Sequence, residues 1–160
     1  MAPLIVLVAV ALTARLLGWF GVPALREWAA ATRVGLAAMF AFTAAAHFTD
    51  LRADLIRMVP PEIPNPEFVV TFTGICELLG AVGLLLPRTR RAAAVALIVF
   101  LLAVFPANLH AALSGATLGG TPVMPLVPRV LLQIFFIVLV AWSGLQAPGD
   151  RPPGEEQGSQ

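Results

Sequence analysis

Residues 68–86 read FVVTFTGICELLGAVGLLL, a run of mostly apolar and small residues with one charged side chain, Glu77. A helix that crosses a membrane needs about 20 mostly apolar residues, because the hydrocarbon core is about 30 Å thick and a helix rises about 1.5 Å per residue. By the same criterion of length and apolar composition, we expect five spanning helices, at about residues 3–20, 29–48, 68–86, 92–113 and 130–145. The sequence therefore predicts an all-α transmembrane helical bundle.

The composition excludes a water-soluble domain. Of the 160 residues, 59% are hydrophobic and 12% are charged, whereas roughly a quarter are charged in soluble domains. The formal net charge of +1 gives no reason to expect nucleic acid as a partner, so the partner that the composition predicts is the lipid bilayer. Cys76 is the single cysteine, which excludes an internal disulfide, and we interpret it as a small buried apolar side chain.

The first span is the weakest of the five. Arg15 interrupts it and leaves an apolar core from Leu4 to Leu12, which is short enough to resemble the apolar region of a signal peptide. Neither Lys nor Arg precedes this core, and no clean small-x-small cleavage site follows it. We therefore interpret residues 3–20 as a spanning helix and residues 1–146 as one multi-pass membrane domain.

The distribution of arginines predicts which side of the membrane each loop faces. With five spans, the C-terminal tail lies on the same side as two loops, and this side carries Arg26, Arg88, Arg90, Arg91 and Arg151, with Arg15 and Arg33 near enough to reach it. The basic residues of the opposite side are partly offset by acidic ones. The positive-inside rule then predicts a protein of the bacterial cytoplasmic (inner) membrane with its N-terminus outside and its C-terminus in the cytoplasm. Trp19, Trp28 and Trp142 fall near the same cytoplasmic interface.

Two loops and the tail have distinctive compositions. Asp50 is placed to cap a short helix in the connection from Thr49 to Glu67. The same connection then contains Pro60, Pro61, Pro64 and Pro66, which favour extended polyproline geometry and predict a rigid lid. The connection after residue 113 is rich in Gly and Pro and is expected to fold back on the membrane surface. Residues 147–160 have the composition of a disordered cytoplasmic tail.

Glu77 lies near the middle of its span, where a carboxylate costs a few kcal/mol, so it should be protonated or hydrogen-bonded to a neighbouring helix. Gly74 shares a helical face with it, and Gly80 and Gly83 lie close by. Small residues allow helices to approach closely. We therefore expect Glu77 to face the interior of the bundle.

Further polar side chains gather toward the exterior half of the membrane. Pro106 is expected to kink the fourth span and to free a carbonyl near Asn108 and His110. His47 closes the second span at the same level, and Gln133 lies early in the fifth. The sequence thus predicts an outward-facing ligand pocket whose candidate binding residues are Glu77, His47, Asn108, His110 and Gln133.

Two other interpretations of these residues remain open. Polar side chains in a membrane often only hold helices together, and histidines at helix ends often lie in the interface without a special role. His47 and His110 lie on separate helices and could in principle hold a haem. Two histidines without a spacing motif are too few ligands for a dedicated site, so we expect no haem and no metal site. The sequence also contains no catalytic motif.

Four segments, in order, resemble the DoxX-like family of small bacterial membrane proteins. They are AAAHF at residues 44–48, MVPPEIPNP at 58–66, TGICELLGAVGLLLPRTRRAAA at 73–94 and AVFPANLHAAL at 103–113. The resemblance covers about residues 30–145 and implies a four-helix core, with the first span as an N-terminal addition. The positions that match the recurring pattern are His47, Pro60, Pro61, Gly74, Glu77, Gly80, Pro87, Arg91, Pro106 and Asn108. The resemblance assigns no catalytic residue.

What the resemblance implies about function is broad, since relatives are linked to quinone-dependent thiosulfate oxidation, to redox-stress complexes or to the assembly of partner proteins. The first hypothesis is an auxiliary subunit of a membrane redox system that binds a quinone or similar amphiphile. The alternative is a membrane chaperone or assembly factor without a small-molecule ligand, whose glycine faces pack on another protein. A small-solute transporter is a weaker hypothesis, because the chain lacks paired broken-helix repeats.

Overall fold

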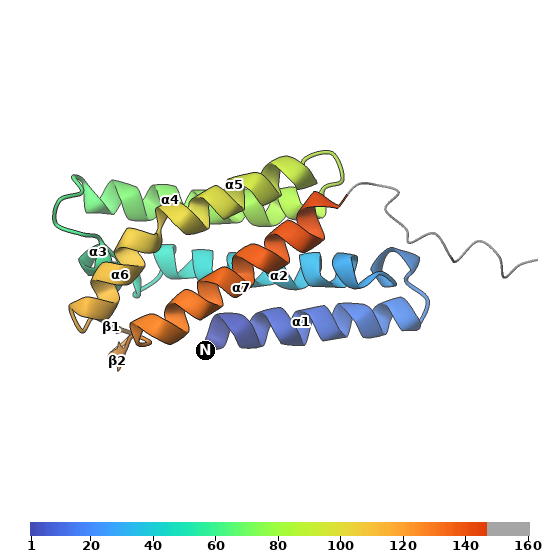
Figure 1. The fold of residues 1–160 in the computed structure, drawn as a ribbon, viewed down its shortest axis with the longest axis horizontal. Coiled ribbons are helices and arrows are strands. Elements are labelled where there is room, and N and C mark those ends of the chain that lie inside the picture. Colours follow the sequence, from blue (N-terminus) through green and yellow to red (C-terminus); the bar gives the residue numbers. More distant parts are fainter. Residues whose placement is uncertain (147–160) are drawn as a thin grey trace, which may run out of the picture.

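The computed structural model describes residues 1–146 (Figure 1). The tail predicted at residues 147–160 lies outside the described residues. The α-helices of the described part are α1 (Ala2–Trp19), α2 (Trp28–Ala45), α3 (Arg52–Met58), α4 (Pro66–Leu85), α5 (Arg90–Ala103), α6 (Phe105–Leu113) and α7 (Leu126–Leu145). Short 3₁₀ helices η1 (Pro23–Leu25) and η2 (Ala46–Phe48) flank α2, and strands β1 (Thr117–Leu118) and β2 (Thr121–Pro122) form a small antiparallel hairpin.

Five helical segments are long and apolar enough to cross a membrane: Ala2–Trp19, Trp28–Phe48, Pro66–Leu85, Arg90–Leu113 and Leu126–Leu145. Their outward faces carry large apolar side chains, such as Phe72 and Leu79 of α4, which are 56% and 68% exposed. Apolar surface of this extent is stable in lipid but not in water. The chain is therefore a helical membrane protein.

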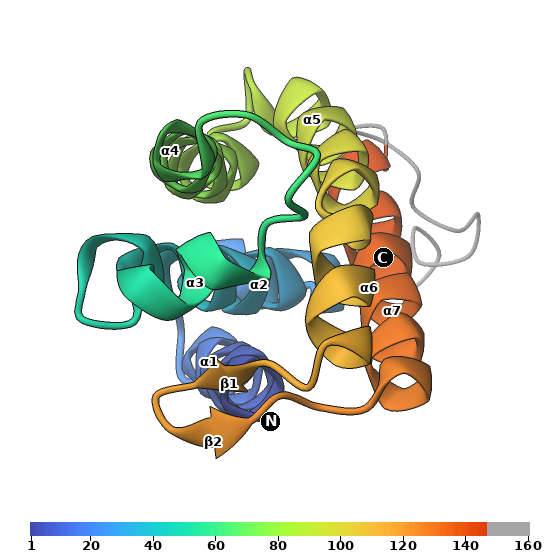
Figure 2. The same cartoon turned by 90° about the vertical axis from the view of Figure 1, so that its left-hand side faces the viewer.

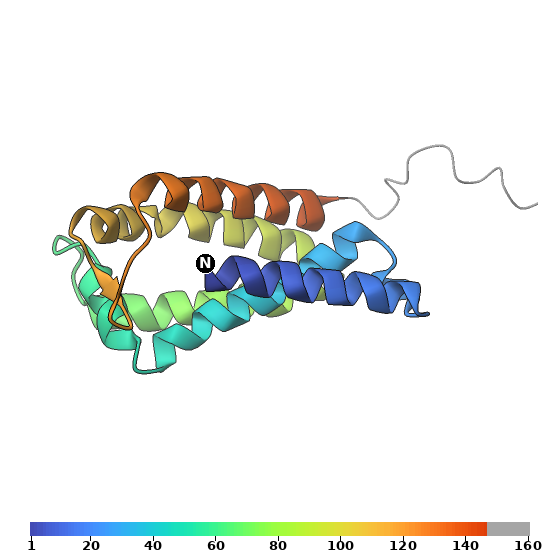
Figure 3. The same ribbon diagram turned by 90° about the horizontal axis from the view of Figure 1, so that it is seen from below.

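The core is a four-helix bundle of α2, α4, α5 and α7, in which each helix packs against two neighbours and α7 closes the ring against α2. Helix α1 packs along α2 on the outside of this bundle (Figures 1 and 3). Leu36, Phe40, Leu84, Leu97 and Val140 fill the centre and are almost fully buried. The predicted all-α bundle, with a four-helix core and one added N-terminal helix, is confirmed.

The close approach of α1 and α2 depends on Gly35. A Cβ atom at this position would lie 2.6 Å from the Leu7 carbonyl oxygen and 2.9 Å from the Ala11 Cβ. Backbone atoms cannot move aside as a flexible side chain can, so only glycine allows this helix pair to pack so tightly.

The fourth span bends where the sequence predicts a kink. Helix α5 ends at Ala103, and α6 begins at Phe105, with Pro106 in its first turn. Proline is tolerated in a first turn because the amide that it lacks would have no intrahelical partner there. The bend therefore falls at Val104, just before the proline.

One end of the bundle is covered by α3 and the β-hairpin (Figure 2). The Gly119 amide donates to Asp54 Oδ2 at 2.7 Å, which ties the hairpin to α3. Arg52 Nη1 donates to the His47 carbonyl at 3.1 Å, and its Nη2 donates to the Glu67 carbonyl at 3.0 Å. These bonds hold α3, and with it the β-hairpin, across the ends of α2 and α4.

Two details of the loops differ from the sequence predictions, and a third, a hairpin, was not predicted. Asp50 does not cap α3, since the residue at the N-cap position is Leu51 and no side chain bonds there. The proline-rich loop contains a turn, in which the Ile63 amide donates to the Pro60 carbonyl at 3.0 Å, instead of continuous polyproline geometry. The segment after α6 forms the hairpin, because Gly119 and Gly120 adopt positive φ angles of 58° and 76°, which suit a tight turn.

Candidate functional site

His47 lies against α4 at a position where that helix carries no side chain. A Cβ atom added to Gly74 would lie 2.7 Å from the His47 Cβ, 2.9 Å from its Cγ and 3.0 Å from Phe48 Cε2. Gly74 thus makes the space that the imidazole occupies between α2 and α4. Gly80 and Gly83 serve the next interface in the same way, against Leu97 and Ala93 of α5.

The His47 ring is oriented by a backbone carbonyl. Its Nδ1 lies 2.7 Å from the Val70 carbonyl oxygen. A carbonyl can only accept a hydrogen bond, so Nδ1 carries a hydrogen and donates it. The Nε2 atom is then left for the other neighbour of the ring, the Glu77 carboxyl.

Glu77 and His47 form a buried pair. Glu77 Oε2 lies 3.5 Å from His47 Nε2, and the two side chains are 10% and 14% exposed. Glu77 Oε2 has no hydrogen-bond partner within the described residues, while Oε1 accepts from Thr43 Oγ1 at 3.1 Å. One proton satisfies both partners: on the carboxyl it makes the pair neutral, and on the ring it makes an ion pair. The geometry therefore allows the two groups to share one proton.

A second polar cluster lies between α6 and α7. Asn108 Nδ2 donates to Gln133 Oε1 at 3.4 Å, and Gln133 Nε2 donates to the Leu101 carbonyl at 2.6 Å. Arg129 Nη1 donates to Asn108 Oδ1 at 2.9 Å. Leu101 lies in the turn of α5 that precedes the bend at Val104. The Gln133 side chain therefore supplies a hydrogen-bond donor to a carbonyl beside the bend.

The candidate ligand residues thus fall into two groups. Glu77 and His47 lie together between α2 and α4, and Asn108 and Gln133 lie together between α6 and α7. Within residues 1–146, no hydrogen bond or ion pair joins the two groups, and the His110 side chain, which is half-buried, bonds to neither. No group of three or more potential metal ligands from His, Cys, Asp and Glu occurs in this part of the chain.

Arg129 is a member of the second cluster that lies just before the fifth span expected from sequence, at about residues 130–145. A signal for it was present, because Arg129 and Gln133 are four residues apart and so share a helical face. The charge of Arg129 argued against extending the span toward it. The Asn108 oxygen, which stabilises that charge, becomes visible only in three dimensions.

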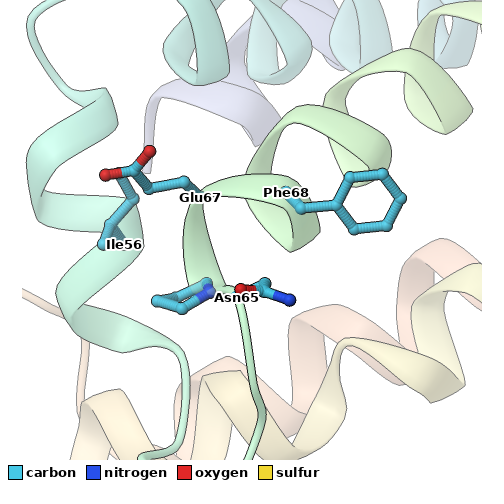
Figure 4. A pocket seen from close by; sticks show the side chains of 5 residues that line it. Ile56, Asn65, Glu67 and Phe68 are labelled. Carbon is cyan, nitrogen blue, oxygen red and sulfur yellow. The ribbon is translucent and has the colours of Figure 1, made fainter.

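A shallow surface depression lies where the proline-rich loop meets α4 (Figure 4). Its lining residues come from α3, from the loop and from the first turn of α4, and they are Ile56, Asn65, Pro66, Glu67 and Phe68. None of the five candidate ligand residues lines it. Asn65 adopts the left-handed region with φ of 53°, which turns the chain directly into Pro66 at the start of α4.

Comparison with known sequences gives one family. No curated protein and no solved structure matches the chain. The sequence profile of the family described as "Domain of unknown function (DUF8561)" matches residues 36–144, which run from within α2 to the last turn of α7. The matched residues contain the Glu77–His47 pair and the Asn108–Gln133 pair, while α1 lies before them. The chain therefore belongs to the DUF8561 family.

Proposed function

We propose that this protein is an auxiliary subunit of a membrane redox system and that it binds a quinone or a similar amphiphile. The observation that carries the proposal is the Glu77–His47 pair, in which a carboxyl and an imidazole face each other at 3.5 Å inside a membrane bundle and can share one proton. Reduction of a quinone to a quinol consumes two electrons and two protons. Electrons would come from a redox partner protein, the pair would donate one proton to a quinone oxygen, and water would supply the second proton to the other oxygen; in quinol oxidation each step would run in reverse.

The resemblance of four segments to DoxX-like proteins supports the same proposal, because relatives are linked to quinone-dependent oxidation. Those segments contain His47, Gly74, Glu77 and Asn108. In the structure, three of these residues build the proton-holding pair and the space around it. Relatives linked to quinone-dependent oxidation thus support the redox subunit together with the geometry, whereas relatives linked to the assembly of partner proteins support the alternative.

The alternative, an assembly factor without a small-molecule ligand, loses the feature that suggested it. Gly74, Gly80 and Gly83 were expected to offer a close-packing face to another protein. They lie instead against His47, Leu97 and Ala93 of the same chain. We therefore rank the redox subunit first.

Co-purification tests the proposed function. The wild type, Glu77→Gln and Thr13→Val are purified in mild detergent, and bound quinone is extracted and quantified. Thr13→Val is the matched control, because Thr13 is exposed on α1 and bonds only within its own helix, to the Ala9 carbonyl. We expect near-stoichiometric quinone in the wild type and the control. A recurrent protein partner without any quinone would instead support the assembly factor.

We further propose a cytoplasmic-membrane location with the N-terminus outside and the C-terminus in the cytoplasm. Arg26, Arg88, Arg90 and Arg91 support it, because they lie in or beside the loops at the end of the bundle where α1 and α7 finish (Figure 1), and basic residues accumulate on the cytoplasmic side. We expect a fluorescent protein fused to the C-terminus to fluoresce and alkaline phosphatase fused there to be inactive. Phosphatase activity at the C-terminus would contradict this orientation.

The purified protein is expected to be colourless in the visible range. A haem needs an axial ligand with a free ring nitrogen, whereas His47 Nδ1 bonds to the Val70 carbonyl and its Nε2 faces Glu77. An absorption spectrum of protein purified from cells supplied with haem precursor checks this expectation. A Soret band that disappears in His47→Ala or His110→Ala would show that a haem is bound.

A further inference from the structure

Two arginines from different helices meet at the C-terminal end of α7, far from the proton-holding pair. Arg33 of α2 donates through Nη1 to the Ser143 carbonyl at 2.7 Å. Arg90, the first residue of α5, donates through Nη2 to the Gln146 carbonyl at 2.9 Å. Both guanidinium groups therefore lie at the last turn of α7, where helix carbonyls carry partial negative charge.

The positive charge at this place exceeds what residues 1–146 balance. The Arg33 and Arg90 guanidinium groups are near enough for their charges to repel each other. Each has five N–H donors, and Arg90 Nε is buried without a hydrogen-bond partner in the described part of the chain. The ion pairs found within residues 1–146 are His47–Glu77 and Arg57–Asp54, so no carboxylate there compensates Arg33 or Arg90.

We propose that Arg33 and Arg90 bind the phosphate of an anionic phospholipid headgroup. Guanidinium groups bind phosphate oxygens in a bidentate way, and basic pockets between membrane helices are suited to such headgroups. The ends of α7, α4 and α1 and the starts of α2 and α5 lie together at this end of the bundle (Figure 1). Both side chains are half-buried, so an anchored headgroup could reach them from the bilayer.

The test measures thermal unfolding and lipid binding of the full chain in neutral detergent. Phosphatidylglycerol or phosphatidylcholine is added, and bound lipid is counted by native mass spectrometry. We expect phosphatidylglycerol, but not phosphatidylcholine, to raise the Tm of the wild type. In the Arg33→Gln/Arg90→Gln variant, we expect the affinity for phosphatidylglycerol to fall about thirtyfold, since each of the two arginines contributes roughly 1 kcal/mol near an anionic headgroup.

The matched control is Arg88→Gln/Arg91→Gln, which removes the same charge from two exposed positions beside Arg90. It should keep most of the lipid-dependent rise in Tm. If Arg33→Gln/Arg90→Gln fails to fold, Arg33→Lys/Arg90→Lys keeps the charge without the bidentate geometry and should bind phosphatidylglycerol more weakly than the wild type. The proposal would be overturned if the Arg33→Gln/Arg90→Gln variant, or the Arg33→Lys/Arg90→Lys variant that replaces it, bound phosphatidylglycerol as tightly as the wild type.

Two further experiments test whether free phosphate or the C-terminal tail, and not a lipid headgroup, supplies the negative charge that binds Arg33 and Arg90. Inorganic phosphate that raises the Tm in neutral detergent as much as phosphatidylglycerol does would overturn a lipid site in favour of free phosphate. A variant with Asp150, Glu155 and Glu156 changed to their amides tests whether the tail occupies the arginines. A lipid-dependent rise that is seen only in this variant would show that the tail holds them, and would also overturn the proposal.

Discussion

Glu77→Leu lowers the free energy of unfolding in detergent by about 1 kcal/mol, the usual size of an interhelical hydrogen bond in a membrane protein. Glu77 is 8% exposed, so the leucine would remain inside the bundle. It would leave Thr43 without its interhelical acceptor and His47 without its facing carboxyl. Thermal melting of the two proteins in the same detergent measures the difference.

Glu77→Gln separates the chemical role of the carboxyl from its role in packing. Glutamine keeps the shape and the hydrogen-bonding capacity, so its melting curve should match that of the wild type. It cannot exchange a proton, and we expect bound quinone to fall at least tenfold, the scale of a hydrogen bond that involves a charged group. A glutamine variant that equals the wild type in both stability and bound quinone would remove Glu77 from the site.

Gly74→Ala is expected to have the second large effect. Its methyl group would lie 2.7 Å from the His47 Cβ, so α2 and α4 would have to move apart. Overpacking of this kind costs about 1–3 kcal/mol, partly offset by the gain of up to about 1 kcal/mol in helix propensity. We expect a net loss of about 1–2 kcal/mol, together with reduced quinone binding because His47 is displaced.

Gly83→Ala is the matched control for this substitution. It makes the same chemical change on the same helix, and its methyl group would lie 2.7 Å from the Ala93 Cβ, at the other end of α4. Both variants should melt at lower temperature. If Gly83→Ala reduces quinone binding as much as Gly74→Ala does, the loss reflects general instability and not the position of His47.

The helices could be predicted from sequence because the cost of exposing backbone polar groups to lipid leaves few alternatives to a helix. Their ends depend on local contacts. Helix α7 begins at Leu126, whereas hydropathy places its start near residue 130, since it counts Arg129 as a loop charge. In the structure, Asn108 accepts from Arg129, and Pro128 lies within the first turn of α7, where proline is tolerated.

The grouping of the polar side chains could not be predicted from spacing alone. Sequence places His47 and Asn108 near the outer level of the membrane and Glu77 nearer the middle of its span, but depth does not define how each helix is rotated. The space beside Gly74 brings His47 to Glu77, whereas the bend at Val104 leaves Asn108 beside Gln133. The hairpin at residues 117–122 was missed for a related reason, because two-residue strands have no periodicity to detect.

The central claim, that Glu77 holds a proton that a bound quinone can take up or release, has a direct test. Infrared difference spectra are recorded while a short-chain quinone is reduced in the reconstituted wild type, in Glu77→Gln and in the Thr13→Val control. We predict a change in a carboxylic-acid C=O band in the wild type and the control that is absent from Glu77→Gln. The same carboxyl change in Glu77→Gln as in the wild type, or no carboxyl change in any of the three proteins, would contradict the account.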